Sequence, residues 1–246
     1  MTRNIKIILE YDGTKYHGWQ RQANGLTIQE ILEDGISTIT QEDVRVVGSG
    51  RTDAGVHAMN QVANFRINSD IKEIGLLRGI NSVLPWDVVV KELAEVDASF
   101  HARYNAKSKT YMYQIYCGAV RSALYRNYAW FIHETLDIER MQEAARLLLG
   151  TFDFSSFCAA NCGIENHVRT VMSVHIAIDR RGMMKFCIEA NGFLNYMVRN
   201  IVGTLADVGR GKLSSAEFMR IVEAKDRKQA SQTAPAHGLF LKEVKY

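Results

Sequence analysis

One carboxylate, Asp53, lies in a glycine-rich segment whose residue types suit a loop that meets a ligand. Residues 48 to 58 read Gly-Ser-Gly-Arg-Thr-Asp-Ala-Gly-Val-His-Ala, so Arg51 precedes the acid by two positions. Three glycines in eight residues disfavour a helix or a strand, because glycine loses the most conformational freedom on folding. They favour positive φ angles or a close approach by another group. The residues alone leave two interpretations of Asp53 open: a group that acts on a ligand, or a turn residue that bonds to its own backbone.

The glycine pattern is not a nucleotide-binding fingerprint. Gly48 and Gly50 begin like G-x-G-x-x-G, but the third glycine position is Asp53, whose charge would repel a pyrophosphate. The chain also contains no G-x-x-x-x-G-K-[S/T] phosphate-binding segment. Asp53 has no second carboxylate near it at a spacing that would suit a two-metal site. These observations disfavour nucleotide hydrolysis and two-metal nuclease chemistry.

A second feature is the segment from residue 98 to residue 133, which contains no aspartate or glutamate and is here called the acid-free segment. Its cations alternate with flat rings, a mixture that binds phosphates and stacks unpaired bases. A strand whose rings fill a core explains any one tyrosine equally well, but it does not explain 36 residues without acid. Residues 11 to 21 have the same mixture, and we interpret both as RNA contacts. The acid-free segment carries Phe100, His101, Arg103, Tyr104, Lys107, Lys109, Tyr111, Tyr113, Tyr116, Arg121, Tyr125, Arg126, Tyr128, Trp130, Phe131 and His133.

Composition places the chain among ordinary globular proteins. Its 246 residues are 47% hydrophobic, and the net charge of +3 permits an anionic partner without requiring one. Charges near the N-terminus leave no signal-peptide core, and no uncharged run approaches the ~18 residues of a membrane span. We therefore expect a soluble, cytoplasmic protein with no membrane partner and with reduced cysteines.

Three possible metal ligands, Cys158, Cys162 and His167, fall close together in the sequence. Zinc sites of the finger type need four ligands at set spacings, and here a fourth ligand is missing and no C-x-x-C pair is present. We therefore expect no metal site.

Hydrophobic periodicity predicts the order β-α-β-β-α-β in the first half of the chain. The first helix begins with the capping box Thr27-x-x-Glu30, and the second ends near Pro85. The expected strands are residues 5–11, 44–47, 61–67 and 88–96, and the expected helices are residues 27–38 and 71–84.

A similar order recurs in the second half. A strand over residues 109–117 precedes a helix over 137–150, which we expect to end at Gly150, and a hairpin joins strands 168–178 and 183–190. Helices over 194–208 and 214–224 and a strand over 238–246 follow, the last helix starting with the capping box Ser214-x-x-Glu217.

These elements predict an α+β fold with two ferredoxin-like, RRM-like halves, residues 1–104 and residues 105–246. We expect the halves in a pseudo-twofold arrangement, with a mixed, mainly antiparallel sheet and a central cleft. The first half would carry the Asp53 loop, and the second would carry the Tyr111 strand and the Arg199 helix.

Several segments resemble the signature segments of the tRNA pseudouridine synthase A family. They are Gly50-Arg-Thr-Asp-Ala-Gly-Val-His-Ala58, the strand Lys109-Thr-Tyr-x-Tyr113, and Asn191-x-Phe-x-x-x-Met-Val-Arg-Asn-Ile-Val-Gly203. Residues 10–14 and 18–20 are similar to that family as well, so the resemblance covers essentially the whole chain.

The resemblance implies isomerisation of uridine to pseudouridine at positions 38 to 40 of the tRNA anticodon stem-loop, by a homodimer without cofactor or metal. Asp53 is then the catalytic nucleophile, Tyr111 stacks on the target base, and Arg199 pairs with the catalytic acid. For Arg51 the resemblance leaves two roles open: it helps to extrude the nucleotide from the stem, or it contacts a phosphate.

Two other functions compete with this one. A non-catalytic RNA-binding module with two RRM-like halves fits the element order, but neither half contains the K/R-G-F/Y-G/A-F-V-x-F/Y segment of such modules. A base-excising glycosylase would also need a carboxylate near the sugar, and it would release free uracil.

Overall fold

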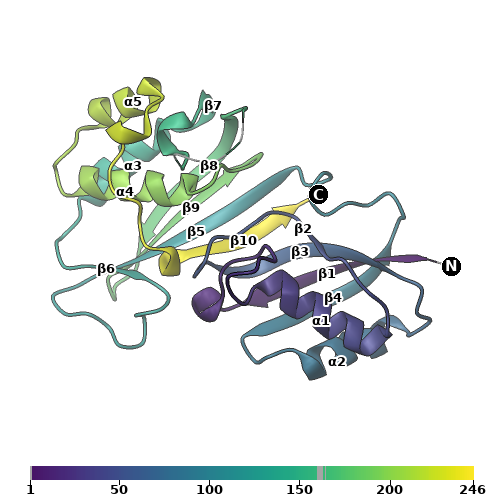
Figure 1. The fold of residues 1–246 in the computed structure, drawn as a ribbon. Helices are drawn as coiled ribbons and strands as arrows, with labels where there is room; N and C mark the ends of the chain where they lie inside the picture. The colour runs from purple at the N-terminus through teal and green to yellow at the C-terminus, as the bar shows by residue number, and fades with distance from the viewer. Residues whose placement is uncertain (1, 160–162, 164) are drawn as a thin grey trace. The chain divides into compact units, whose positions relative to one another are not determined.

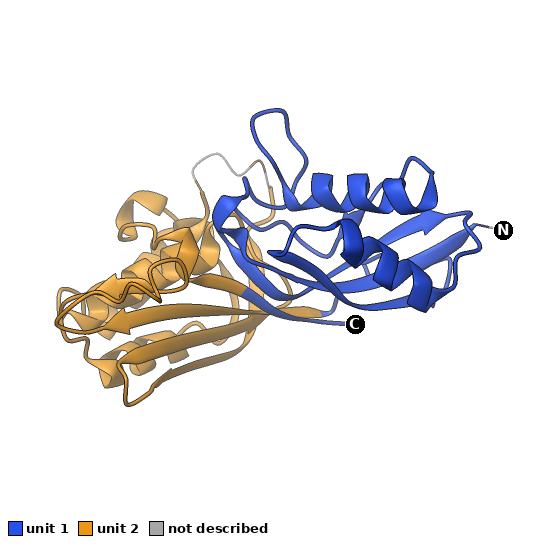
Figure 2. Ribbon diagram, turned by 90° about the horizontal axis from the view of Figure 1, so that it is seen from below, with its two compact units in different colours: residues 1–107, 241–246 blue, residues 108–240 orange. Residues whose placement is uncertain are grey.

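The computed structural model describes residues 2–159, 163 and 165–246, and Figure 1 shows their course. The chain forms two compact units, coloured separately in Figure 2. Unit 1 comprises residues 1–107 together with 241–246, and unit 2 comprises residues 108–240. The units thus place residues 241–246 with the first part of the chain. The predicted domain boundary between residues 104 and 105 stays a prediction.

Unit 1 is built on antiparallel strands. Strand β1 (Arg3–Tyr11) lies between β3 (His57–Ile67) and β4 (Val88–Val96), and the two-residue strand β2 (Val47–Gly48) pairs with β3. The last strand, β10 (Leu239–Lys245), follows β3 in the strand order. Alternate residues Ile5, Ile7 and Leu9 of β1 are fully buried, as expected for a strand that presents one face to a core.

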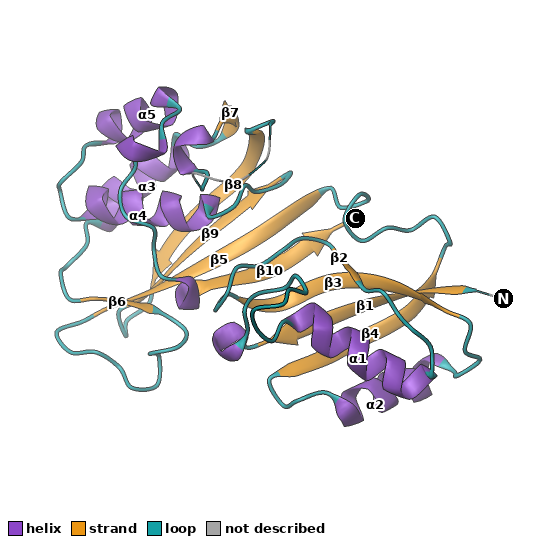
Figure 3. Ribbon diagram, viewed as in Figure 1, coloured by secondary structure: helices purple, strands orange, loops and turns teal. Residues whose placement is uncertain are grey.

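Helices α1 (Ile28–Thr40) and α2 (Glu73–Val83) cover one face of these strands (Figure 3). Helix α1 buries Ile28, Leu32 and Ile36 at helical spacing. The predicted N-cap is confirmed, because the side chain of Thr27 accepts a hydrogen bond from the Glu30 N–H.

Unit 2 has a second antiparallel set of strands. Strand β5 (Ser108–Cys117) pairs with β9 (Met183–Ala190), β9 pairs with β8 (Val168–Ile178), and β8 pairs with β7 (Gly150–Asp153). The short strand β6 (Trp130–Ile132) runs parallel to β5.

Unit 2 also contains the helices α3 (Ile138–Arg146), α4 (Met197–Gly209) and α5 (Ser215–Ala224), which Figure 3 shows beside its strands. Helix α4 is buried along nearly its whole length. The capping box predicted at Ser214 and Glu217 is complete, with both reciprocal hydrogen bonds present. The α+β class and the mainly antiparallel strand pairing are confirmed.

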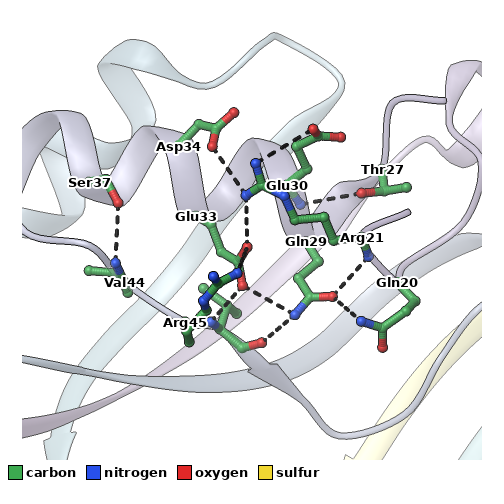
Figure 4. A network of polar contacts seen from close by, with 11 residues as sticks. Gln20, Arg21, Thr27, Gln29, Glu30, Glu33, Asp34, Ser37, Val44 and Arg45 are labelled. Atoms are coloured by element: carbon green, nitrogen blue, oxygen red, sulfur yellow. Dashed lines mark hydrogen bonds and ion pairs between the residues drawn. The ribbon is translucent and has the colours of Figure 1, made fainter. Parts of the chain in front are cut away.

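The predicted strand at residues 44–47 is wrong for most of its length, since only Val47 belongs to β2. Side chains of α1 bind the backbone of this segment instead. The Val44 N–H donates to Ser37 Oγ at 3.4 Å, and the Val46 N–H donates to a carboxylate oxygen of Glu33 at 3.1 Å (Figure 4). Donors that are used in this way are not available for a strand ladder.

The second half departs from prediction in several places, among them the start of α4, which begins at Met197 rather than at residue 194. The helix expected over residues 137–150 ends at Arg146, and Gly150, with a φ of +112°, begins β7 rather than capping the helix. Strands β6 and β7 were not predicted, because three and four residues are too few to display an alternating pattern.

Helix α4 approaches the backbone of residues 232–234 closely in unit 2. A Cβ atom built on Gly203 would lie 1.8 Å from the carbonyl oxygen of Gln232. The fully buried Asn200 donates to the Phe157 carbonyl at 2.8 Å and accepts from Thr233 Oγ1 at 2.7 Å. These contacts tie α4 to the segment before β10 and leave no room for a side chain at position 203.

The substitution Gly203→Ala should destabilise the protein by about 3 kcal/mol, because backbone must move to accommodate the methyl group. Urea unfolding followed by circular dichroism measures the change. Gly75→Ala in α2 is the matched control, since the nearest heavy atom to its Cβ would be an Ile71 methyl at 3.4 Å. The control should stabilise by less than about 1 kcal/mol. Equal stabilities for Gly203→Ala and the wild type would contradict the packing described.

Candidate active site

The loop that carries Asp53 connects β2 to β3 and is bound by the segment that follows β1. The Trp19 N–H donates to the Thr52 carbonyl at 3.0 Å. Gly18 has a φ of +85°, and a Cβ there would lie 2.5 Å from the same carbonyl oxygen. The hydroxyls of Tyr11 and Thr52 are 2.8 Å apart and buried. The residue before Asp53 is therefore fixed through both its backbone and its side chain.

The chain after Asp53 is held in the same way. The Val56 N–H donates to the Asp53 carbonyl at 3.1 Å and closes a turn in which Gly55 has a φ of +76°. The Gly55 N–H donates to the Tyr16 carbonyl at 3.2 Å. A Cβ on Gly13 would lie 2.0 Å from the carbonyl oxygen of Val56. The positive φ expected from the glycines is thus present at Gly55, next to the half-buried Asp53.

Two buried polar side chains support the start of the loop. Ser49 Oγ donates to the amide oxygen of Gln61 at 2.6 Å, and Gln61 Nε2 donates to the Gly50 carbonyl at 3.0 Å. Both side chains are fully buried, so these bonds form away from competing water. Together with the contacts described above, these bonds hold the backbone on both sides of Asp53 in one conformation.

Arg51 is exposed, and its Nε donates to the amide oxygen of Gln20 at 3.1 Å. The amide of Gln20 in turn donates to Gln29 on α1 at 2.8 Å. Figure 4 shows the interior of this network, where Gln29 reaches the carboxylate of Glu33 at 3.2 Å. A line of side-chain hydrogen bonds therefore joins Arg51 to the N-terminal half of α1.

Glu33 is the buried charge of this network, with 2% of its surface exposed. Its carboxylate receives hydrogen bonds from Arg21 at 3.0 Å and from the Val46 N–H at 3.1 Å. The hydrogen bond to Glu33 raises the pKa of the Arg21 guanidinium. A buried carboxylate is tolerated only when it is paired in this way, so Glu33 fixes α1 to the segment that leads into β2.

Burial raises the pKa of Tyr11, with the hydrogen bonds to Thr52 and Gln61 acting in the opposite direction. Desolvation dominates because the phenol is enclosed and an ionised oxygen would lose its hydration. The Tyr11 hydroxyl next to the Asp53 loop therefore stays neutral at physiological pH and serves as a hydrogen-bonding group.

In unit 2, Tyr111 lies on β5 opposite Ile188 of β9. Its ring is 7% exposed and meets the ring of Phe193 edge-on, with centroids 4.9 Å apart. Tyr113, two residues along on the same face, is fully buried, and its hydroxyl donates to the Pro235 carbonyl at 2.7 Å. For Tyr113 the core interpretation is correct. The Tyr111–Phe193 pair differs from Tyr113 in being partly exposed, because Phe193 is only half-buried.

Arg199 lies on α4 and is held from two sides. Its Nε donates to the Ala234 carbonyl at 2.8 Å, and the Ala234 N–H donates back to the Arg199 carbonyl at 3.1 Å. The guanidinium carbon lies 4.7 Å from the ring centre of Tyr196, a cation–π distance. Burial raises the pKa of Tyr113, and the charge of Arg199 acts against this rise. Arg199 and Tyr113 thus bind neighbouring backbone carbonyls, those of Ala234 and Pro235, and Tyr113 is two residues from Tyr111 on β5.

The four predicted site residues therefore fall on two well-defined supports. Asp53 and Arg51 belong to the loop over residues 49–56 of unit 1, here called the clamped loop. Tyr111 and Arg199 belong to β5 and α4 of unit 2. Sequence reasoning did not identify Tyr11 and Gln61 as supports of the loop. Their partners lie 41 and 11 residues away in the sequence.

Two of the three residues considered as metal ligands, Cys158 and His167, lie among the described residues. Cys162 lies outside the described residues, and the Nδ1 of His167 lies 2.8 Å from Ser155 Oγ. Across residues 2–159, 163 and 165–246, the structure contains no group of three or more His, Cys, Asp or Glu side chains that could hold a metal ion. Within the same ranges, no helix combines the length and the apolar character needed to cross a membrane.

A family model and three relatives that match this chain all carry the name tRNA pseudouridine synthase. A family model described as tRNA pseudouridine synthase matches residues 7–105 and 144–246. The chain is 48% identical over 244 residues to tRNA pseudouridine synthase A of Acetivibrio thermocellus, covering 99% of this chain and 100% of that protein. It is 47% identical, with the same coverage of both chains, to the protein of that name in Thermoanaerobacter sp. strain X514. It is 43% identical to that of Geotalea uraniireducens, again over 99% of this chain and all of the relative.

The substitution Tyr11→Phe should destabilise the protein by about 1 to 2 kcal/mol, because it leaves the buried Thr52 hydroxyl without its phenol partner. Urea unfolding measures the loss. Tyr104→Phe is the control, since Tyr104 is 75% exposed and its substitution should change stability by less than about 0.5 kcal/mol. If both variants unfold at the wild-type midpoint, the Tyr11–Thr52 bond does not stabilise the loop.

Proposed function

The chain belongs to the tRNA pseudouridine synthase family and is an isomerase of uridine in tRNA, and we propose that it acts at positions 38 to 40 of the anticodon stem-loop. We further propose that Asp53 is its nucleophile and that the reaction uses no cofactor. The observation that carries the proposal is the clamped loop, which holds a single half-buried carboxylate between backbone segments fixed by buried hydrogen bonds.

The isomerisation needs little more than a carboxylate held in place near the target uridine. The bond from ribose C1′ to N1 of the base breaks, a bond from C1′ to C5 forms, and the hydrogen on C5 is lost as N1 gains one. No electrons are gained or lost overall, so no redox partner is required. A carboxylate can start the reaction by attack on C1′, by attack on C6 of the base, or by removal of a ribose proton.

We propose the remaining roles from the resemblance of the motifs. Tyr111 stacks on the target base, and the half-buried ring of Phe193 beside it supports this role. Arg199 pairs with the charge of the catalytic acid and keeps it ionised. The exposed Arg51 assists extrusion of the uridine or contacts a phosphate. By the same resemblance the protein is a cytoplasmic homodimer, and sedimentation equilibrium tests the dimer.

The substitution Asp53→Asn should lower pseudouridine formation by at least about 1,000-fold while tRNA affinity stays within several-fold, because the amide keeps the shape but not the nucleophile. Release of tritium from tRNA labelled at uridine C5 measures turnover, and filter binding measures affinity. Asp43→Asn, an exposed carboxylate of the same unit, should keep wild-type activity.

Each outcome of this assay has a separate meaning. Wild-type turnover by Asp53→Asn would contradict the assignment of the nucleophile. A wild-type protein that binds tRNA without releasing tritium would be a non-catalytic RNA-binding module. Release of free uracil would identify a base-excising glycosylase instead.

The substitution Arg199→Gln should shift the acidic limb of the pH–rate profile upward by roughly 1 to 3 units. A nearby cation lowers the pKa of a carboxyl group, so its removal raises that pKa, and the reactive carboxylate is then lost at a higher pH. Arg146→Gln, an exposed arginine on α3, is the control and should leave the profile in place. An unshifted acidic limb in Arg199→Gln would show that Arg199 does not pair with the catalytic acid.

A further inference from the structure

Unit 2 contains a cavity of about 280 Å³ whose lining comes largely from the acid-free segment. Four aromatic rings and two arginines form much of its wall: Tyr116, Tyr125, Trp130, Phe131, Arg121 and Arg126. The sequence singled out these residues as a mixture of rings and cations, yet the proposed catalytic roles use none of them. The cavity is close to the lower limit of about 300 Å³ for ligand pockets, which suits one flat ring system.

Local hydrogen bonds form the cavity in the free protein. Strand β6 pairs with β5 so that Tyr116 faces Phe131, with ring centroids 6.3 Å apart. The ring of Tyr125 lies 5.5 Å from that of Tyr116. The N–H groups of Tyr128 and Ala129 both donate to the Tyr125 carbonyl at 2.9 Å, which fixes the loop between the two strands. A ligand would therefore meet a largely preformed wall.

The wall is largely apolar, and the two arginines among its residues favour an anionic group at its edge. Arg121 is exposed, and Arg126 is oriented by a hydrogen bond from its Nη1 to the Ala123 carbonyl at 2.6 Å. None of the residues that line the cavity is an aspartate or a glutamate. Aromatic faces beside arginines are the combination that holds a nucleobase together with its phosphate.

The cavity is separate from the position proposed for the reacting uridine. Tyr111 and Tyr116 are five residues apart on β5, so their Cα atoms are roughly 17 Å apart and their side chains point to opposite faces. A base stacked on Tyr111 cannot reach Tyr116. A nucleotide in the cavity would therefore be a different one from the target uridine.

We propose that this cavity binds an unpaired nucleotide of the tRNA other than the isomerised uridine, with its base on Tyr125 and its phosphate at Arg121. The inference rests on the proposed function only in taking tRNA as the substrate. It adds a nucleotide-binding pocket that positions the tRNA and takes no part in the bond rearrangement.

The test compares Tyr125→Leu with Tyr125→Phe, which keeps the ring. Fluorescence anisotropy with labelled tRNA should show that Tyr125→Leu weakens binding about 5- to 100-fold, whereas Tyr125→Phe stays within about twofold of the wild type. In single-turnover experiments the defect of Tyr125→Leu should appear mainly as a higher protein concentration for the half-maximal rate, about 5- to 100-fold above the wild type. A blunt RNA duplex without unpaired nucleotides should bind Tyr125→Leu and the wild type equally.

Arg121→Ala provides a second variant that does not depend on the packing of a ring, because the side chain is exposed. It should weaken tRNA binding and reduce the slope of log affinity against log salt by about 1. Arg146→Ala on α3 is the matched control and should leave that slope unchanged.

Three results would overturn the inference. They are wild-type tRNA affinity in Tyr125→Leu, an equal loss of affinity for the paired duplex, or a change of oligomeric state in sedimentation velocity, which would assign the cavity to self-association. A failure of the catalytic assignment would be recognised separately. If Asp53→Asn proved active, the tRNA affinities of the Tyr125 and Arg121 variants would still test the cavity.

Discussion

The close approach of two loop backbones in unit 1 fixes the position of Asp53, and the proposed chemistry depends on it. Gly13 and Gly18 allow the segment after β1 to lie against the carbonyls of Val56 and Thr52, where any side chain would collide. Buried bonds of Tyr11 and Gln61 secure the same loop from the sheet side. A carboxylate held by its neighbours in this way needs little reorganisation when a substrate arrives, which is the physical advantage of a preorganised site.

In unit 2, the three tyrosines of strand β5 lie on both faces of the strand. Tyr111 and Tyr113 share one face, where Tyr113 and Arg199 both bind the backbone of residues 234–235 and so fix the region around α4. Tyr116 points to the other face and lines the cavity with Tyr125 and Phe131. The length of β5, roughly 17 Å between the Cα atoms of Tyr111 and Tyr116, therefore separates the proposed base-stacking residue from Tyr116. Trp130 of β6 contributes a ring to the cavity from the face of Tyr113.

Much of the fold was predictable because the strands carry a clear alternating pattern with turn residues at their ends. Strands β4, β8 and β9 have the predicted bounds, and so does the hairpin that joins β8 to β9. The failure at Val44 and Val46 has a physical reason, since side chains of α1 take up the backbone donors that a strand would use. Such a choice of partner depends on tertiary structure and leaves no mark in the local sequence.

For the candidate site, the loop around Asp53 was predictable, whereas the contacts that hold it were not. Glycine spacing indicated a loop around Asp53, and the structure shows that loop with the expected positive φ at Gly55. The buried polar supports could not be predicted, because Glu33 and Gln61 look like ordinary surface residues until folding brings their partners together. The rings of the acid-free segment were predicted as a group, but only the fold assigns Tyr113 to the core and Tyr125 to a cavity wall.

The most direct test of the central claim is a crystal structure of Asp53→Asn bound to tRNA. Our account predicts that the side chain at position 53 lies within about 3.5 Å of the ribose or of C6 of the target uridine, with the loop backbone unchanged. A target uridine bound far from this side chain, with another carboxylate next to its ribose, would contradict the account.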